Sequence, residues 1–420
     1  MILDSDTMTA NERVKKVINH EEPDRIPVYL MGIPPYSQVY IELMANDEAI
    51  LDQWTENDEN IILTPMGDFT VRYNLGTEVE TRSIGIRSDF TNKHLDENNK
   101  IIGNYNPTLK KELLEKLREE QEEDPDKGQG LEYKYVNYNG NITGSTILPN
   151  GREYSWYIDG YLKKEEDIID WFDTYGWHHE KEISGFDVNL FKQCQRDFGD
   201  KICLIPQIGG CQLFESLWPM MGMSRFGYYC RKKPELIHRL VKTRKEAQLK
   251  ILDEIEKVKP DAIFGGDDMG QKGRSLISPR TFRKYFKEPY RELCDRIHEM
   301  GAIFYIHSCG NIVDLLPDLI EAGLDGWQSM EPDSLIDHAA VKKKWGDNFL
   351  LVGGLNQSYM TEPGVGPKEV EQHVKSQIKK MAKGGGYIAG PAHDYLNVPL
   401  KNAIALRDSI YKWGQYPINF

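Results

Sequence analysis

The chain lacks most of the features that mark secreted or membrane proteins. It contains 6 cysteines among 420 residues, and their irregular spacing is typical of reduced thiols and not of a disulfide framework. No stretch approaches 18 consecutive apolar residues, which argues against a transmembrane helix. Residues 1–11 are polar and do not form the apolar core of a signal peptide. We therefore expect a cytoplasmic protein with no membrane partner.

Basic residues are also in the minority. The chain has 52 lysines and arginines against 66 aspartates and glutamates, for a net charge of −14, which argues against a nucleic-acid partner. Apolar residues make up 40% of the chain, enough to form a large core. The composition predicts a soluble globular protein that acts on a small molecule or binds another protein. A homodimer stays open.

Short apolar segments alternate with amphipathic helices from about residue 200 onward. Such alternation predicts parallel βα units. Together with two earlier segments, the predicted strands are 25–31, 60–65, 202–209, 262–270, 303–311, 326–332, 349–357 and 387–393. Helices are predicted between the later strands at 233–257, 279–300, 312–321, 335–344 and 368–383. Eight strands are the number in a closed (β/α)8 TIM barrel, so we predict an α/β fold with one barrel domain over residues 1–420.

One segment, residues 71–160, does not follow this rhythm. It contains short alternating pieces, among them 77–86, 131–138 and 153–157, around one charged helix at 109–122. Alternation of apolar and polar residues is typical of half-buried strands. We predict an insertion of β-hairpins and a helix after the second strand.

A histidine and a cysteine close the fifth predicted strand, which reads Phe304-Tyr-Ile-His307-Ser-Cys309-Gly-Asn. In a strand, residues two apart point to the same side. Imidazole and thiolate are ligands that zinc favours, so His307 and Cys309 could supply half of a tetrahedral site. The alternative is that Cys309 is a small buried apolar residue and His307 a hydrogen-bonded core histidine.

The active site of a TIM barrel lies at the carboxyl ends of its strands. The other predicted strand ends carry Met31, Gln207, Asp267, Asp268, Glu331, Asn356, Gln357, His393 and Asp394. Three of these, Asp267, Glu331 and His393, have side chains that can bind zinc. Alternatives stay open: Asp268 could cap a turn, Glu331 could be an exposed loop carboxylate, and His393 could bind substrate without metal.

Several segments resemble the uroporphyrinogen decarboxylase superfamily. They are Asn11-Glu-Arg-Val-Lys-Lys-Val-Ile-Asn-His-Glu-Glu-Pro-Asp-Arg-Ile-Pro-Val, Gly265-Gly-Asp-Asp-Met-Gly, His307-Ser-Cys-Gly-Asn and Gly-Gly-Gly-Tyr387-Ile. The resemblance extends over residues 10–35 and 185–415 and implies the barrel fold. The decarboxylases of this superfamily bind an anionic tetrapyrrole with arginines in the loop after the first strand. Here that loop, residues 31–38, contains no arginine.

A second branch of the superfamily comprises zinc methyltransferases that exchange methyl groups with the corrinoid of a carrier protein. Its motif is His-x-Cys followed by a second cysteine near the last strand. His307 and Cys309 match the first part, and His393 stands where the second cysteine is expected. Glu331 lies where this branch can offer a carboxylate. The resemblance therefore implies Zn²⁺ held by His307, Cys309 and at least one of Glu331 and His393, and a corrinoid (cobalamin) carried by a partner protein.

The departure from two thiolates predicts a more electron-poor and more Lewis-acidic zinc, which suits a poor leaving group such as that of a methyl ether. Among superfamily members, the chain resembles the methyltransferase component of anaerobic aromatic O-demethylases, which implies a methoxyaromatic substrate. Asp267, Asp268 and Asn356 are expected to orient the substrate or to supply hydrogen bonds. Expected substrate-binding residues are Met31, Tyr36, Gln207, Phe214, Trp218, Tyr305 and Gln357.

The sequence also predicts where a partner protein docks, and it leaves other functions open. The loops 31–41 and 211–223 are rich in apolar residues, so we expect an exposed apolar surface there that docks the corrinoid protein. The alternative is that these residues close over the pocket as a lid. Transfer of methyl groups from amines or thiols stays open. Two further alternatives are a lyase that acts on a carboxylate without metal and a binding protein on a degenerate barrel.

Overall fold

The computed structural model describes residues 5–30, 79–86, 90–104, 131–147, 153–184, 187–211 and 213–420. The chain divides into two compact units. The first comprises Met1–Gly85, Gly185–Gly210 and Leu249–Phe420, and the second comprises Ile86–Ser184 and Cys211–Gln248. Met31, Tyr36 and the predicted strand 60–65 lie outside the described residues. Within the described ranges, no helix is long and apolar enough to cross a membrane.

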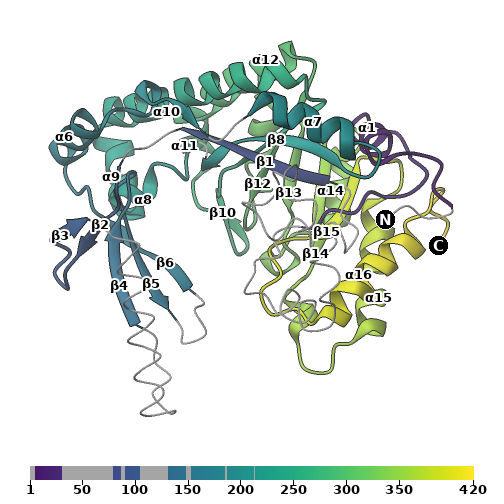
Figure 1. The fold of residues 1–420 in the computed structure, drawn as a ribbon. Helices are drawn as coiled ribbons and strands as arrows, with labels where there is room; N and C mark the ends of the chain where they lie inside the picture. Colours follow the sequence, from purple (N-terminus) through teal and green to yellow (C-terminus); the bar gives the residue numbers. More distant parts are fainter. Residues whose placement is uncertain are drawn as a thin grey trace. The chain divides into compact units, whose positions relative to one another are not determined.

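A parallel sheet forms the centre of the first unit, with the strand order β15-β14-β13-β12-β9-β8-β1 (Figure 1). The strands are β1 (Val79–Ile86), β8 (Cys203–Cys211), β9 (Ala262–Gly266), β12 (Ile303–Ser308), β13 (Gly326–Ser329), β14 (Leu350–Leu355) and β15 (Tyr387–Pro391). Every residue of β13, β14 and β15 is buried. Burial of both faces is expected of parallel strands that are covered by helices.

The first predicted strand lies beside the last one. Val28 forms a parallel bridge with Ala389. The amide of Tyr29 donates to the carbonyl of Ala389 at 2.8 Å, and the amide of Ala389 donates to the carbonyl of Pro27 at 3.1 Å. A parallel sheet whose first and last strands meet is curled as in a barrel. The structure thus confirms the predicted α/β barrel fold.

Strand β1 differs from the prediction. Residues 77–86 were expected to form part of the hairpin insertion, but β1 pairs in parallel with β8, from Val79 beside Cys203 to Ile84 beside Ile208. That part of the prediction was wrong. The alternating pattern of Val-Glu-Thr-Arg-Ser-Ile identifies a strand but does not reveal its partner.

In the first unit, helices alternate with the strands along the sequence. They are α1 (Ala10–Ile18), α7 (Val188–Phe198), α11 (Pro279–Tyr285), α12 (Lys287–Glu299), α13 (Leu316–Glu321), α14 (His338–Trp345), α15 (Pro367–Met381) and α16 (Leu400–Trp413). Short 3₁₀ turns occur at η2 (Glu256–Val258), η3 (Pro332–Ser334) and η4 (Tyr359–Thr361), and β10 (Gly270–Gln271) pairs with β11 (Arg274–Ser275). The single helix predicted over 279–300 is divided at Phe286.

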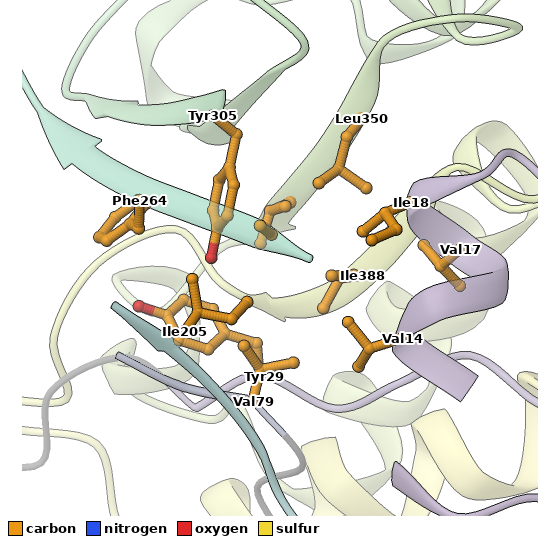
Figure 2. Packing of buried hydrophobic residues seen from close by; sticks show 12 residues of the cluster. Val14, Val17, Ile18, Tyr29, Val79, Ile205, Phe264, Tyr305, Leu350 and Ile388 are labelled. Carbon is orange, nitrogen blue, oxygen red and sulfur yellow. The ribbon is translucent and has the colours of Figure 1, made fainter. Parts of the chain in front are cut away.

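The core of the first unit lies between α1 and the amino-terminal halves of the strands. Figure 2 shows apolar side chains of α1 together with inward-facing residues from several strands. The cluster comprises Val14, Val17, Ile18, Tyr29, Val79, Ile205, Ala262, Phe264, Tyr305, Leu350, Val352 and Ile388. These residues fill the sheet interior at the amino-terminal halves of the strands. Polar side chains can therefore lie at the carboxyl ends.

Buried ion pairs hold α1 in this position. The guanidinium of Arg13 donates to Asp24 at 2.7 and 2.9 Å, and that of Arg25 donates to Asp6 at 2.7 and 2.9 Å. The side chains of Arg13 and Arg25 are 1% and 0% exposed. Burial raises the pKa of Asp24, but the hydrogen bonds from Arg13 and Thr7 outweigh burial and hold the pKa below its ordinary value. Two buried ion pairs therefore hold the N-terminal segment in place. Buried charges are tolerated in proteins when they are paired in this way.

The second unit contains an antiparallel sheet with the order β3-β2-β4-β5-β6. Its elements are β2 (Lys93–Leu95), β3 (Ile101–Asn104), β4 (Leu131–Val136), β5 (Asn141–Ile147), β6 (Glu153–Gly160), α6 (Glu165–Tyr175), η1 (His178–Glu180), β7 (Ile183–Ser184), α8 (Trp218–Met221) and α9 (Met223–Lys232). Helix α10 (Pro234–Ile255) begins in this unit and ends in the first.

The apolar surface expected at 211–223 is not found in the described part of that loop. Leu213, Met220 and Met221 are 0% exposed. The carbonyl of Met220 accepts from the amide of Leu162 at 3.0 Å, and a Cβ at Gly160 would approach Met221 to within 2.3 Å. These side chains form the core of the second unit, where α8 packs on the antiparallel sheet, so the expectation of an exposed docking surface there was wrong.

Candidate metal centre

The turn after β12 presents the first two predicted ligands. His307 lies in register with Gly266 of β9 and Gln328 of β13. The strand ends at Ser308, and Gly310 takes a positive φ of 73°. A Cβ at Gly310 would lie 2.4 Å from the amide nitrogen of Gln271, so the close approach of the two backbones requires glycine.

Three side chains from two strand ends converge. His307, Cys309 and His393 each offer one ligand atom, and these atoms all lie within 4.8 Å of one another. Nε2 of His307 is 3.1 Å from Sγ of Cys309. Ligand atoms of a tetrahedral zinc site are roughly 3.3–3.7 Å apart, given Zn–N bonds of ~2.0–2.1 Å and Zn–S bonds of ~2.3 Å. The separation of this pair is thus close to the one that zinc requires, and the donor set fits the metal.

The hydrogen bonds of His307 determine which ring nitrogen can bind a metal. Nδ1 contacts Oε1 of Gln328, and Nε2 of the same amide donates to the carbonyl of Ala392 at 3.4 Å. Because the amide nitrogen faces a carbonyl, its oxygen faces the ring, and Nδ1 must carry the proton. In the neutral ring, the lone pair of His307 is therefore on Nε2, on the side of Cys309.

His393 is held differently. The amide of Asp394 donates to Nδ1 of His393 at 2.9 Å, so the lone pair of the neutral ring is on Nδ1 and the proton is on Nε2. The backbone amide of His393 donates to Oε1 of Gln357 at 3.2 Å, which fixes the strand end that carries the ring. To bind a metal through Nε2, His393 must move its proton to Nδ1 and give up the bond from Asp394.

Two carboxylates fix the turn that carries the thiol. Oδ1 of Asp268 accepts from the amide of Cys309 at 2.8 Å and lies 3.4 Å from Nε2 of His307. Oε2 of Glu331 accepts from the amide of Gly310 at 3.1 Å and from the hydroxyl of Ser334 at 2.8 Å. The structure does not bring Glu331 into the three-residue cluster. Its observed role is to orient the loop, whereas Asp268 lies beside the cluster with a side chain that is 32% exposed.

The other two residues expected to take part in catalysis are engaged in the scaffold. Asp267 is 0% exposed, and its carboxylate accepts from the hydroxyl of Tyr290 at 2.6 Å. The side-chain amide of Asn356 donates to Asp333 at 2.8 Å, and its oxygen accepts from the amide of Tyr359 at 3.0 Å. Both residues therefore position loops and strands at this end of the sheet.

The residues expected to bind substrate fall into several groups. Gln207 lies two residues after the core residue Ile205, at the middle of β8, so it faces the same side as Ile205. Tyr305 is 2% exposed and belongs to the core cluster (Figure 2). Phe214 and Trp218 belong to the second unit. Contacts of these residues, and of Gln357, Met31 and Tyr36, with a substrate stay predictions.

Comparison of the chain with models of protein families identifies its family. The model of the uroporphyrinogen decarboxylase (URO-D) family matches residues 192–413, more than half of the chain. The chain belongs to this family. The matched range contains the URO-D strands β8 to β15 and all three residues of the metal cluster. No curated protein sequence matches the chain.

One solved structure matches this fold over nearly the whole chain. The chain is similar to a methyltransferase from Methanosarcina mazei, with 16% identity, 96% of this chain and 99% of that chain covered, and a TM-score of 0.58. Weaker similarity is found to a D-allulose 3-epimerase from Methylomonas sp., with 11% identity, 54% and 82% covered, and a TM-score of 0.35. The first comparison shows the fold of the URO-D chain over nearly its whole length.

The sequence analysis did not single out Gln328 and Tyr290, which contact the predicted site residues His307 and Asp267. Gln328 is 0% exposed in a fully buried strand, and Tyr290 is 0% exposed on α12. A polar residue inside an otherwise apolar buried strand is a signal that could have identified Gln328. No comparable signal marks Tyr290, because a tyrosine on an amphipathic helix is common in a core.

Proposed function

We propose that this URO-D family protein is a zinc-dependent methyltransferase that moves a methyl group from a small methylated substrate to the cob(I)alamin of a corrinoid protein. The observation that carries the proposal is the convergence of His307, Cys309 and His393 at the carboxyl ends of the barrel strands. The M. mazei protein of the same fold is a methyltransferase, which supports the same reaction class. Within that class, an aryl methyl ether is the substrate we favour, so the protein would act in O-demethylation.

The ligand set supports an ether substrate. His307 and Cys309 would hold zinc directly, His393 would complete a set of three protein ligands, and a fourth position would be open to substrate, as in catalytic zinc sites. Zinc with two imidazoles and one thiolate supplies Lewis acidity toward an oxygen leaving group. In the net reaction the C–O bond of the ether breaks, phenolate keeps the electron pair, and the methyl group forms a bond to cobalt, which is formally oxidised from Co(I) to Co(III).

The remaining residues of the centre would orient the reactants. Cys309 would lose its thiol proton to solvent when a metal ion binds, because Nε2 of His307, 3.1 Å away, would itself be a ligand and could not keep that proton. Asp268 is partly exposed beside His307 and could accept a hydrogen bond from a hydroxyl on the ring of the substrate. A carboxylate there would disfavour an anionic ring substituent close to it, so Asp268 would affect which substrate binds.

The proposal is tested by elemental analysis of the purified protein together with a methyl-transfer assay. The assay supplies a corrinoid protein in the Co(I) state and a panel of methoxyaromatics, methylamines and methyl thiols. We expect about one zinc per chain and methylation of cobalt with a methoxyaromatic, and loss of both in Cys309→Ala. Turnover of a carboxylated substrate to CO₂ without metal would instead establish a lyase. An amine or thiol that outperforms every ether would retain the methyltransferase and overturn the ether assignment.

A further inference from the structure

Gln328 connects the two strand ends that carry the histidines. It lies on β13, in register with His307 of β12 on one side and with Val352 of β14 on the other. Its side chain is fully buried. One end of its amide contacts Nδ1 of His307, and the other end donates to the carbonyl of Ala392, the residue before His393. One side chain thus fixes a ring and the backbone next to a second ring.

The orientation of this amide selects one tautomer of His307. If the amide were reversed, its NH₂ group would face Nδ1 and its oxygen would face the carbonyl of Ala392. The second contact would then join two acceptors in a buried environment, which costs about 1–3 kcal/mol for an unsatisfied group. The carbonyl of Ala392 therefore orients Gln328, and Gln328 in turn keeps the proton of His307 on Nδ1.

We propose that Gln328 is a positioning residue that commits His307 to the tautomer whose Nε2 can bind a metal ion, and that it does so before any metal is present. The expected effect of Gln328 on zinc affinity rests on the proposed function. The tautomer of His307 does not, because it is a property of the metal-free protein. Partners of this kind, which hold the second nitrogen of a ligating histidine, typically change metal affinity by 10–100-fold when they are removed.

The chain offers a matched control. Gln377 on α15 is 5% exposed, and its Oε1 lies 3.1 Å from Nδ1 of His338 on α14. This is a second buried glutamine paired with a histidine, and neither residue belongs to the metal cluster. Gln328→Met and Gln377→Met both remove a buried amide and keep a side chain of similar length. A general loss of stability would affect the two variants alike.

The first arm of the test reads the tautomer without metal. Long-range ¹H–¹⁵N spectra of histidine-labelled, metal-free protein, with His307→Ala used for assignment, report which ring nitrogen carries the proton. We expect Nδ1–H for His307 in the wild type and in Gln328→Glu, whose carboxyl group, protonated on the oxygen that donates to the carbonyl of Ala392, still accepts from Nδ1. We expect loss of this single tautomer in Gln328→Met and no change in Gln377→Met. A wild-type His307 protonated at Nε2, or an unchanged tautomer in Gln328→Met, would overturn the inference.

The second arm measures zinc affinity by competition with a chelator on the full chain. We expect Gln328→Met to bind zinc 10–100-fold more weakly than the wild type, Gln328→Glu to recover most of that loss, and Gln377→Met to bind like the wild type. Equal affinity of Gln328→Met and the wild type would contradict a positioning role. A wild-type protein that binds no zinc would refute the proposed function, and the first arm would still decide whether Gln328 sets the tautomer.

Discussion

Separate replacement of the two histidines should weaken zinc binding unequally. Zinc centres with four protein ligands bind with about 10–16 kcal/mol, or roughly 2.5–4 kcal/mol per ligand if the ligands contribute equally. Since 1.4 kcal/mol corresponds to a tenfold change, His307→Ala should weaken binding by about 100- to 1,000-fold. Nε2 of His307 needs no rearrangement, because its lone pair is already on the side of Cys309.

His393 must first lose the hydrogen bond that Nδ1 accepts from the amide of Asp394 at 2.9 Å. Such a bond contributes about 0.5–1.5 kcal/mol, so the net contribution of His393 to zinc binding is smaller by that amount. His393→Ala should therefore cost roughly two- to tenfold less affinity than His307→Ala.

The assay is a competition titration of metal-stripped protein with zinc and a chromophoric chelator, with circular dichroism to confirm that each variant is folded. His298→Ala is the control, since this ring is 40% exposed, pairs with Asp325 at 2.8 Å and lies on α12 away from the cluster. It should bind zinc like the wild type. Equal losses in the two site variants, or a larger loss in His393→Ala, would refute the assignment of the two tautomers.

Three further predictions concern the residues around the centre and the base of the barrel. Glu331→Gln should keep zinc affinity within about threefold of the wild type, because Glu331 orients the backbone of Gly310 and does not join the cluster; a loss of 100-fold in the chelator titration would make it a ligand. Asp268→Asn should retain zinc and change the Michaelis constant or the preference among hydroxylated methoxyaromatics, and unchanged kinetics across such a panel would exclude that role. Asp24→Asn should lower the free energy of unfolding by about 1.5–3 kcal/mol in chemical denaturation, because it removes the nearer of the two carboxylates beside the buried guanidinium of Arg13 and leaves Asp6 at 3.4 Å, whereas Asp261→Asn, in the exposed pair with Lys15, should cost at most about 1 kcal/mol. The contribution of Asp24 should be fully present above pH ~4 and lost as the pH falls through its lowered folded-state pKa; stability that does not decline in acid, or equal costs for the two variants, would contradict this account.

Much of the barrel could be predicted because its strands are short apolar runs between helices. Strand β12 begins at Ile303 and β15 begins at Tyr387, as predicted. The predicted ends were too long, since 303–311 included the turn that carries Cys309 and 387–393 included the loop that carries His393. A strand ends where its backbone leaves the ladder, which for β12 is after Ser308 and before the positive φ of Gly310, and hydrophobicity does not report this point.

The candidate ligands could be predicted from residue type and spacing, but the tautomers of the two histidines could not. His307 and Cys309 are two residues apart, so the strand geometry alone brings them together. The tautomers depend on Gln328, 21 residues from His307, and on the local fold around Asp394. The part of Glu331 in metal binding stays a prediction: its chemistry suits zinc, but it lies outside the three-residue cluster, and its Oε2 accepts from the amide of Gly310.

The most direct test of the account is a single-turnover experiment with the corrinoid protein held as cob(I)alamin and one methoxyaromatic in excess. The formation of methylated cobalt is followed by absorbance in the wild type, in metal-stripped protein and in stripped protein to which one equivalent of zinc has been returned. The account predicts rapid methylation in the first, none in the second and recovery in the third, with stoichiometric release of the phenol. Equal rates of methylation in the stripped and zinc-loaded proteins would contradict it.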